Sequence, residues 1–213
     1  MTAIITSYGR VSADGLIGPG LRRTWKQVLT DTKTPADKVE CGLPHLRHKY
    51  FVGAGETNPR YGRMDILCKL AVGAADLCLA GDALAGINRD EIAIVGGTQL
   101  GCLEVDAQYY DTLLKGGSSG ASPALFVYTL PSMFVGEVAI RFGLRGRSTL
   151  ISEAANSARA ALMAGARLVE KGRAPACLVL YADAFGPAAE QLTPRPNVET
   201  LGCAWLLTRQ GQG

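Results

Sequence analysis

Short, continuously apolar stretches alternate along the chain with longer stretches in which apolar residues recur every three or four positions. The continuous stretches cover residues 3–11, 91–97, 148–154, 176–184 and 202–209. Runs of this length are typical of strands that are buried on both faces of a sheet. Five buried strands are therefore predicted.

Helical spacing is found in residues 21–30, 62–84, 102–117, 131–146 and 156–171. In the second of these stretches Met64, Leu67 and Cys78 fall on one face, which is typical of an amphipathic helix. The middle of the last stretch, residues 160–166, is apolar on every side and predicts a fully buried helix. Residues 31–61 show no period and are rich in Pro, Gly, Lys and His, so we expect a surface loop there.

The alternation of apolar strands and helices predicts an α/β fold, with a mostly parallel sheet covered by helices on both faces. A chain of 213 residues is long enough to bury a full core. Because no linker, repeat or low-complexity tract divides the sequence, we expect a single domain over residues 1–213.

Composition and charge narrow the range of partners. Hydrophobic residues make up 47% of the chain, charged residues make up 19%, and the net charge is only +3. This charge is too small to predict nucleic-acid binding, and no stretch reaches the roughly 18 consecutive apolar residues of a membrane span. The start of the chain, MTAIITSYGR, lacks the basic and apolar regions of a signal peptide, so a cytoplasmic location is expected.

The six cysteines contain no CxxC pair and lie at positions 41, 68, 78, 102, 177 and 203. Those in predicted helices and strands are expected to behave as small core residues, the alternative being a disulfide framework or a metal site. His45 and His48 are the only histidines and have only Cys41 nearby. We therefore expect no metal and no other cofactor.

A strand, a tight turn and a helix follow one another within residues 143–173, GLRGRSTLISEAANSARAALMAGARLVEKGR. Such a turn lifts one side chain above the sheet and holds it at the helix N-terminus, where the partial positive charge stabilises an anion. A cysteine in this place is a strong nucleophile, and backbone N–H groups there hold a developing oxyanion. The residue at this turn is Ala155, which can neither attack, exchange a proton nor bind a metal.

Several segments, in this order along the chain, resemble the N-terminal half of β-ketoacyl synthases, the condensing enzymes of fatty-acid and polyketide assembly. RMDILCKLAV (63–72) resembles the family's Met-Asp helix, and SPALFVYTLP (122–131) resembles its loop into the next helix. GLRGRSTLISEAANSARAAL (143–162) resembles the active-site segment, and KGRAPACLVLYADA (171–184) the strand that follows it. The resemblance implies the N-terminal half of the thiolase-like fold, with a five-stranded, mostly parallel sheet.

The departures from the family pattern bear on activity. Counted without gaps from Gly143, the position of the family's acyl-accepting cysteine falls on Ala155, and a shift by one residue gives no thiol. The family also carries two catalytic histidines, a lysine and a Gly-Phe-Gly oxyanion loop in its second half. Neither histidine of this chain is placed to substitute, so decarboxylative condensation by these 213 residues alone is not expected.

Other residues are weaker candidates for function, each with a structural alternative. Ser152 or Ser157 is a candidate nucleophile for thioester hydrolysis or acyl transfer, the alternative being that Asn156 or Ser157 caps the helix. By analogy with relatives, the acyl-cavity candidates are Phe126, Tyr128, Met133 and Phe134, unless they are plain core residues. Candidates for steering an acidic acyl carrier protein are Arg141, Arg145 and Arg147, with Arg22, Arg23 and Lys26 elsewhere, unless these are ordinary surface charges.

The resemblance also implies assembly with a second chain. In relatives the strand before the nucleophile pairs across the dimer axis, and here that strand covers about Ser148 to Ala154. The interface candidates are Leu150, Ile151, Ser152 and Glu153. Glu153 is expected either to face the partner or to pair with an arginine such as Arg159. Half of a two-part fold leaves apolar helices uncovered, which favours oligomerisation.

Three functions are consistent with these features. The first is a non-catalytic ketosynthase-like subunit of a type II fatty-acid or polyketide (including polyene) pathway. This subunit would pair with a full-length ketosynthase and shape the acyl cavity. The second is a homo-oligomeric module that binds an acyl chain or acyl carrier protein without condensing activity. The third is a thioester hydrolase or transacylase that uses a serine.

Overall fold

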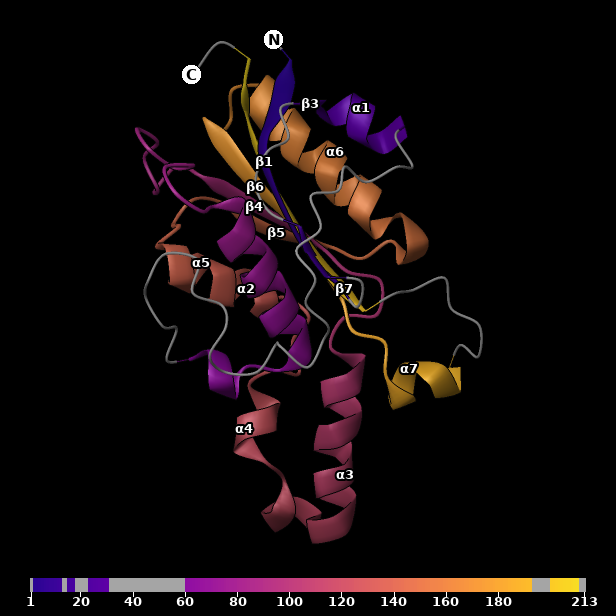
Figure 1. Cartoon of the computed structure of the whole chain (residues 1–213). Coiled ribbons are helices and arrows are strands. Elements are labelled where there is room, and N and C mark those ends of the chain that lie inside the picture. Colours follow the sequence, from indigo (N-terminus) through magenta and orange to yellow (C-terminus); the bar gives the residue numbers. More distant parts are fainter. Residues whose placement is uncertain (1, 13–14, 18–22, 31–59, 193–199, 211–213) are drawn as a thin grey trace.

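The computed structural model of the chain describes residues 2–12, 15–17, 23–30, 60–192 and 200–210. In this part of the chain all strands join one seven-stranded sheet (Figure 1). The strands are β1 (Ala3–Ser12), β2 (Gly15–Ile17), β3 (Arg23–Thr24), β4 (Ala93–Gly97), β5 (Ser148–Ile151), β6 (Ala176–Asp183) and β7 (Leu201–Arg209). Their order across the sheet is β2-β1-β7-β6-β4-β5, and β3 pairs with β1.

The five longer strands confirm the predicted sheet. β4 pairs in parallel with β5 and β6, whereas β7 runs antiparallel to both of its neighbours, β1 and β6. Four of these five strands therefore share one direction, and β7 alone is reversed. The sheet is larger than predicted, because β2 and β3 each add a short antiparallel segment to β1.

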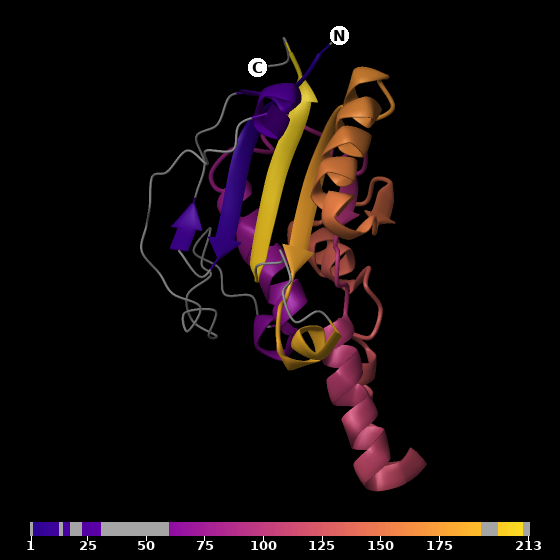
Figure 2. The ribbon, with the colours of Figure 1, turned by 90° about the vertical axis from the view of Figure 1, so that its right-hand side faces the viewer.

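The helices lie on both faces of the sheet, as predicted. They are α1 (Trp25–Thr30), α2 (Ile66–Cys78), α3 (Leu103–Gly120), α4 (Pro123–Phe126), α5 (Met133–Phe142), α6 (Ser157–Glu170) and α7 (Pro187–Leu192), with short 3₁₀ turns η2 (Tyr61–Arg63) and η3 (Ala154–Asn156). α2 and α5 cover one face, and α6 covers the other beside α1 (Figure 1). α3 and α4 project beyond the end of the sheet, and the turned view of Figure 2 shows the same projection.

Local sequence explains where the helices begin and end. Asp65 caps α2, because its side chain accepts a hydrogen bond from the Cys68 N–H at 3.0 Å. α5 ends at Gly143, which adopts the left-handed conformation with φ 64° that glycine tolerates without strain. Gly117, with φ 61°, places a kink inside α3.

Apolar side chains form one core on each side of the sheet. The larger core lies under α2 and α5 and includes Leu70, Ile94 and Phe134, all buried. The smaller core lies under α6 and includes Leu162 and Val179. The cysteines predicted to be core residues, Cys68, Cys78, Cys177 and Cys203, are buried free thiols.

Several sequence-based expectations need correction. The sequence did not predict β2, β3, α4 or α7, and the helix expected over 21–30 is β3 followed by the shorter α1. The helix expected over 62–84 is confined to α2, preceded by η2. α6 is not buried on every side, because Arg159 and Arg167 are exposed on its outer face and Met163 is half-buried.

Two further expectations concern the loop over 31–61 and the absence of a membrane span. Most of the loop predicted over 31–61, with Cys41, His45 and His48, lies outside the described residues. In the part of the chain that the structure describes, no helix is long and apolar enough to cross a bilayer.

Gly97, at the end of β4, tests how closely α6 packs on the sheet. A Cβ atom there would lie 2.7 Å from the Ser157 carbonyl oxygen and 3.0 Å from the Ala161 Cβ. We expect Gly97→Ala to lower the free energy of unfolding by about 1–3 kcal/mol, because backbone must move to admit the methyl group.

Gly136→Ala in α5 is the matched control, because a Cβ there meets nothing within 4 Å. Urea denaturation should show the control to be neutral or more stable, given the better helix propensity of alanine. Equal stability of the two variants would contradict the close packing of α6 on β4.

Candidate functional site

The turn from β5 into α6 keeps a strained backbone. Ala154 has φ 47° and is the only non-glycine residue with positive φ among those the structure describes. The left-handed conformation is unfavourable for alanine by roughly 1–2 kcal/mol, and it persists only where the surroundings enforce it. The neighbouring end of β4 is tied to this turn, because the Thr98 N–H donates to the Ile151 carbonyl at 3.2 Å.

Ser157 stabilises the turn from its buried side through two hydrogen bonds. Its side chain is fully buried. The hydroxyl donates to the Ala154 carbonyl at 2.8 Å and accepts from the Glu153 N–H at 2.8 Å. Because both hydrogen-bonding directions are used inside the turn, Ser157 acts as its internal brace, and the side chain of Asn156 makes no capping bond.

The exposed position of the turn carries no reactive atom. Ala155 is exposed at the N-terminal end of α6. Ser152 and Glu153 are exposed beside it. Among the described residues, no salt bridge joins Glu153 to Arg159, and neither histidine of the chain falls in the described part. A serine hydroxyl needs an adjacent base to become a nucleophile, and the described structure supplies none to Ser152.

The loop from β4 into α3 is anchored beside this turn by a buried carboxylate. Asp183, at the end of β6, is fully buried. It accepts hydrogen bonds from the Thr98 hydroxyl at 2.8 Å, the Gln99 N–H at 3.0 Å and the Leu100 N–H at 2.8 Å. The Thr98 hydroxyl accepts in turn from the Gly101 N–H at 2.9 Å. The carboxyl ends of β4, β5 and β6 therefore form one hydrogen-bonded unit.

Three of the four acyl-cavity candidates, Tyr128, Met133 and Phe134, belong to or border the larger core, whereas Phe126 is not part of it. Phe134 is fully buried against Gly96 of β4, and Met133 packs at the border of the same core. Phe126 is 60% exposed and lies against Tyr109 of α3, with ring centroids 5.5 Å apart. Tyr128 lines a cavity between η2 and α4.

The three candidate docking arginines differ in how exposed they are and in whether they already form an ion pair. Arg141 is only 14% exposed and pairs with the buried Asp76 at 3.3 Å. Burial raises the pKa of the Asp76 carboxyl, an effect that Arg141 opposes. Arg145 is exposed and pairs with Asp90 at 2.6 Å, and Arg147 is exposed without a described salt bridge.

The additional basic residues lie elsewhere. Arg23 and Lys26 belong to β3 and α1, on the side of the sheet formed by β1, far across the strand order from β5. Arg22 lies outside the described residues. Arg23 and Lys26 therefore share no common basic surface with the arginines of the α5–β5 connection.

The interface candidates follow one another at the edge of the sheet. β5 is the last strand in the sheet order and pairs only with β4 in the described part of the chain. Leu150 and Ile151 are half-buried, whereas Ser152 and Glu153 are exposed. The N–H groups of Ile94 in β4 and of Thr98 just after it donate to the carbonyls of Arg147 and Ile151. The alternation of a parallel pair therefore turns the backbone groups of Ser148 and Leu150 outward.

Two functional features escaped the sequence. One is the Asp183 anchor, whose only signal was an acidic residue at the end of an apolar strand. The other is Glu137, which is buried and bound by both Arg60 and Tyr128. In the described residues, no group of three or more His, Cys, Asp or Glu side chains is placed to hold a metal ion.

The class of protein follows from this sheet order and turn. The chain matches, over its full length, a ketosynthase in complex with its chain length factor from Xenorhabdus doucetiae, with 18% identity, a TM-score of 0.64 and 81% of that chain covered. The ishigamide ketosynthase/chain length factor is matched at 22% identity and a TM-score of 0.69, over 100% of this chain and 63% of that one. The fold is therefore the thiolase-like fold of ketosynthases.

Sequence comparison adds the family. Residues 23–188 match the model of the beta-ketoacyl synthase N-terminal domain, and the chain belongs to this family, as its motifs predicted. It is 31% identical over 118 residues to 3-oxoacyl-[acyl-carrier-protein] synthase 2 of Synechocystis sp.. That match covers 54% of this chain, and the chain spans only 28% of the length of this relative.

Ser157→Ala tests whether the serine braces the turn. We expect a loss of about 1–3 kcal/mol in the free energy of unfolding, because the Glu153 N–H and the Ala154 carbonyl lose their partner. Ala154→Gly is the companion variant and should be neutral or stabilising, because glycine adopts positive φ without strain. Chemical denaturation measures the free energy of unfolding of both variants. An unchanged free energy for Ser157→Ala would rule out that the serine stabilises the turn.

Proposed function

We propose that this chain is a non-catalytic ketosynthase-like subunit of a type II fatty-acid or polyketide pathway. In this proposal it pairs with a catalytic ketosynthase and bounds the cavity in which the acyl chain grows. The observation that carries the proposal is Ala155, exposed at the strained turn where the family places its nucleophile. A turn that keeps its geometry but has no thiol supports a role for the scaffold rather than for condensation.

The open edge of β5 supports a partner chain. An unpaired strand edge offers N–H and C=O groups to a second strand, which is the usual route to sheet extension between chains. Leu150 and Ile151 lie half-buried beside this edge. We propose that a strand of the partner pairs here.

The projecting α3 and α4 also support a partner. This arm and the residues after it expose large apolar side chains, among them Tyr110, Leu114, Phe126 and Leu130. Soluble monomers rarely leave such side chains clustered in water, so the cluster favours burial against another chain. The relatives of similar fold include a ketosynthase in complex with its chain length factor and a type II acyl-carrier protein in complex with its ketosynthase.

The serine-based alternative has less support. Ser157 is buried and both of its hydrogen-bonding directions are used, so its hydroxyl is not open to a thioester. The homo-oligomeric binding module remains the second hypothesis, because the same open edge and apolar arm suit a second copy of this chain.

Co-expression with the ketosynthase encoded nearest to this chain tests the proposal. Light scattering should give a stable one-to-one or two-to-two complex, and its products should differ in length from those of the ketosynthase alone. A homo-oligomer that does not bind this ketosynthase would instead support the binding module. Condensing activity of this chain by itself would overturn the non-catalytic role.

Ser148→Pro tests the edge of β5 directly. Proline removes the outward N–H of residue 148 while the β4 ladder uses the carbonyl of Arg147. We expect the dissociation constant of the complex to rise at least about tenfold, since a ladder hydrogen bond is lost and the edge is sterically blocked. Ser148→Ala keeps the N–H and should bind as the unmodified chain does.

Circular dichroism of the free variant checks that Ser148→Pro is folded. A folded Ser148→Pro chain that binds with unchanged affinity would move the interface away from β5 and onto the α3–α4 arm.

A further inference from the structure

A cavity of about 360 Å³ lies between η2 and α4, on the side of the sheet that α2 and α5 cover. Its walls are Arg60, Arg63, Ala124, Val127 and Tyr128. The volume falls within the roughly 300–1,000 Å³ of small-molecule sites, which combine mostly apolar walls with a few polar groups. Ala155 lies in η3, at the start of α6 on the other face of the sheet, so this cavity is separate from it.

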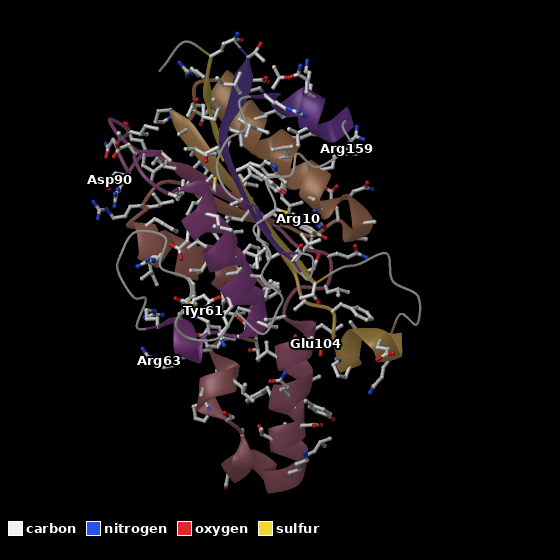
Figure 3. All side chains as sticks on the ribbon, in the orientation of Figure 1. Arg10, Tyr61, Arg63, Asp90, Glu104 and Arg159 are labelled. Atoms are coloured by element: carbon white, nitrogen blue, oxygen red, sulfur yellow. The ribbon has the colours of Figure 1, made fainter. Side chains whose placement is uncertain are left out.

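The 3₁₀ turn brings the two arginines together. The Arg63 N–H donates to the Arg60 carbonyl at 3.0 Å. In a 3₁₀ turn, side chains three residues apart project from the same side. Figure 3 shows Arg63 at this turn near α4, well away from Arg159 on α6.

The two arginines differ in what they already bind. The Arg60 guanidinium donates two hydrogen bonds to Glu137, at 3.0 and 2.8 Å, and Glu137 is buried beneath the cavity. Tyr128 donates to the same carboxylate at 3.4 Å, and burial together with Glu137 raises the pKa of Tyr128 to about 12. Arg63 is exposed and forms no ion pair among the described residues.

The apolar wall stands opposite this charge. Ala124 and Val127 lie on α4 and directly after it, and Val127 is 49% exposed. The surface therefore combines one free guanidinium, a second guanidinium fixed by Glu137, and an apolar patch. A ligand complementary to all three carries a negative head and a short apolar body.

We propose that this cavity binds a small amphipathic anion, with its carboxylate or phosphate head on Arg63 and Arg60 and its apolar body against Ala124, Val127 and the ring of Tyr128. Guanidinium groups bind either head through paired hydrogen bonds. The fixed Arg60 serves as a preorganised donor, because Glu137 holds its position before the ligand arrives. The site does not depend on the proposed partnership with a ketosynthase.

Isothermal titration calorimetry of the full chain with octanoate, octyl phosphate, 1-octanol and inorganic phosphate tests the site. We expect octanoate or octyl phosphate to bind in a saturable one-to-one manner, and the tighter of the two identifies the head. 1-Octanol and inorganic phosphate should each bind at least about tenfold more weakly, because each lacks one half of the ligand. Equal binding of 1-octanol, or of inorganic phosphate, would overturn the proposal.

Substitutions locate the binding on the structure. Arg63→Gln should weaken binding of the better probe at least about fivefold, and Val127→Asp should weaken it similarly by placing a like charge in the apolar wall. Arg147→Gln removes an exposed arginine from the far edge of the sheet and is the matched control. Equal effects of Arg63→Gln and Arg147→Gln, with both variants folded by circular dichroism, would overturn the assignment.

Discussion

The close approach of α6 to the sheet is the constraint on which the turn at Ala155 depends. Gly97 of β4 and Gly165 of α6 leave room for this contact, because a Cβ on either would overlap the opposing element. Gly97 lets the first turn of α6 lie against the end of β4, and Gly165 lets a later turn of α6 lie against Cys177 and Val179 of β6. Ser157 then lies inside the turn rather than above it, where its hydroxyl satisfies the backbone groups of Glu153 and Ala154.

Asp183 extends this constraint to a second loop. A buried carboxylate without partners is strongly unfavourable, so its hydrogen bonds to Thr98, Gln99 and Leu100 are obligatory once β6 places it in the interior. The β4–α3 loop is thereby held against the β5–α6 turn. In open α/β sheets the carboxyl ends of parallel strands are where ligand-binding loops gather. Here those loops are joined by hydrogen bonds, and the arm of α3 and α4 extends beyond them.

Sequence patterns predicted the elements whose apolar residues recur with a regular local spacing. The long apolar strands and α2, α3, α5 and α6 all show it, and the ordered motifs identified the family. α4 and α7 were missed because they are only four and six residues long and begin at Pro123 and Pro187, where Ser-Pro and Gly-Pro indicate a loop.

The buried polar contacts had no local signal at all. Asp76 and Arg141 are 65 positions apart, and Arg60 and Glu137 are 77 apart. Only the packing of α5 against α2 and η2 brings them together. The acyl-cavity candidates stay a prediction for a related reason, because helical spacing does not say which neighbour each face will meet.

The strain at Ala154 has a structural consequence that needs no reactive atom. Positive φ at this residue turns the chain sharply after Ile151, so that β5 ends and α6 begins within a few residues. A longer connection would have to pass over the outer edge of β5 or lift α6 away from Gly97. The strained turn therefore leaves the outer edge of β5 unpaired among the described residues and keeps α6 packed on Gly97. Under the proposed non-catalytic role the turn needs only this geometry, and Ala155 follows it without a thiol.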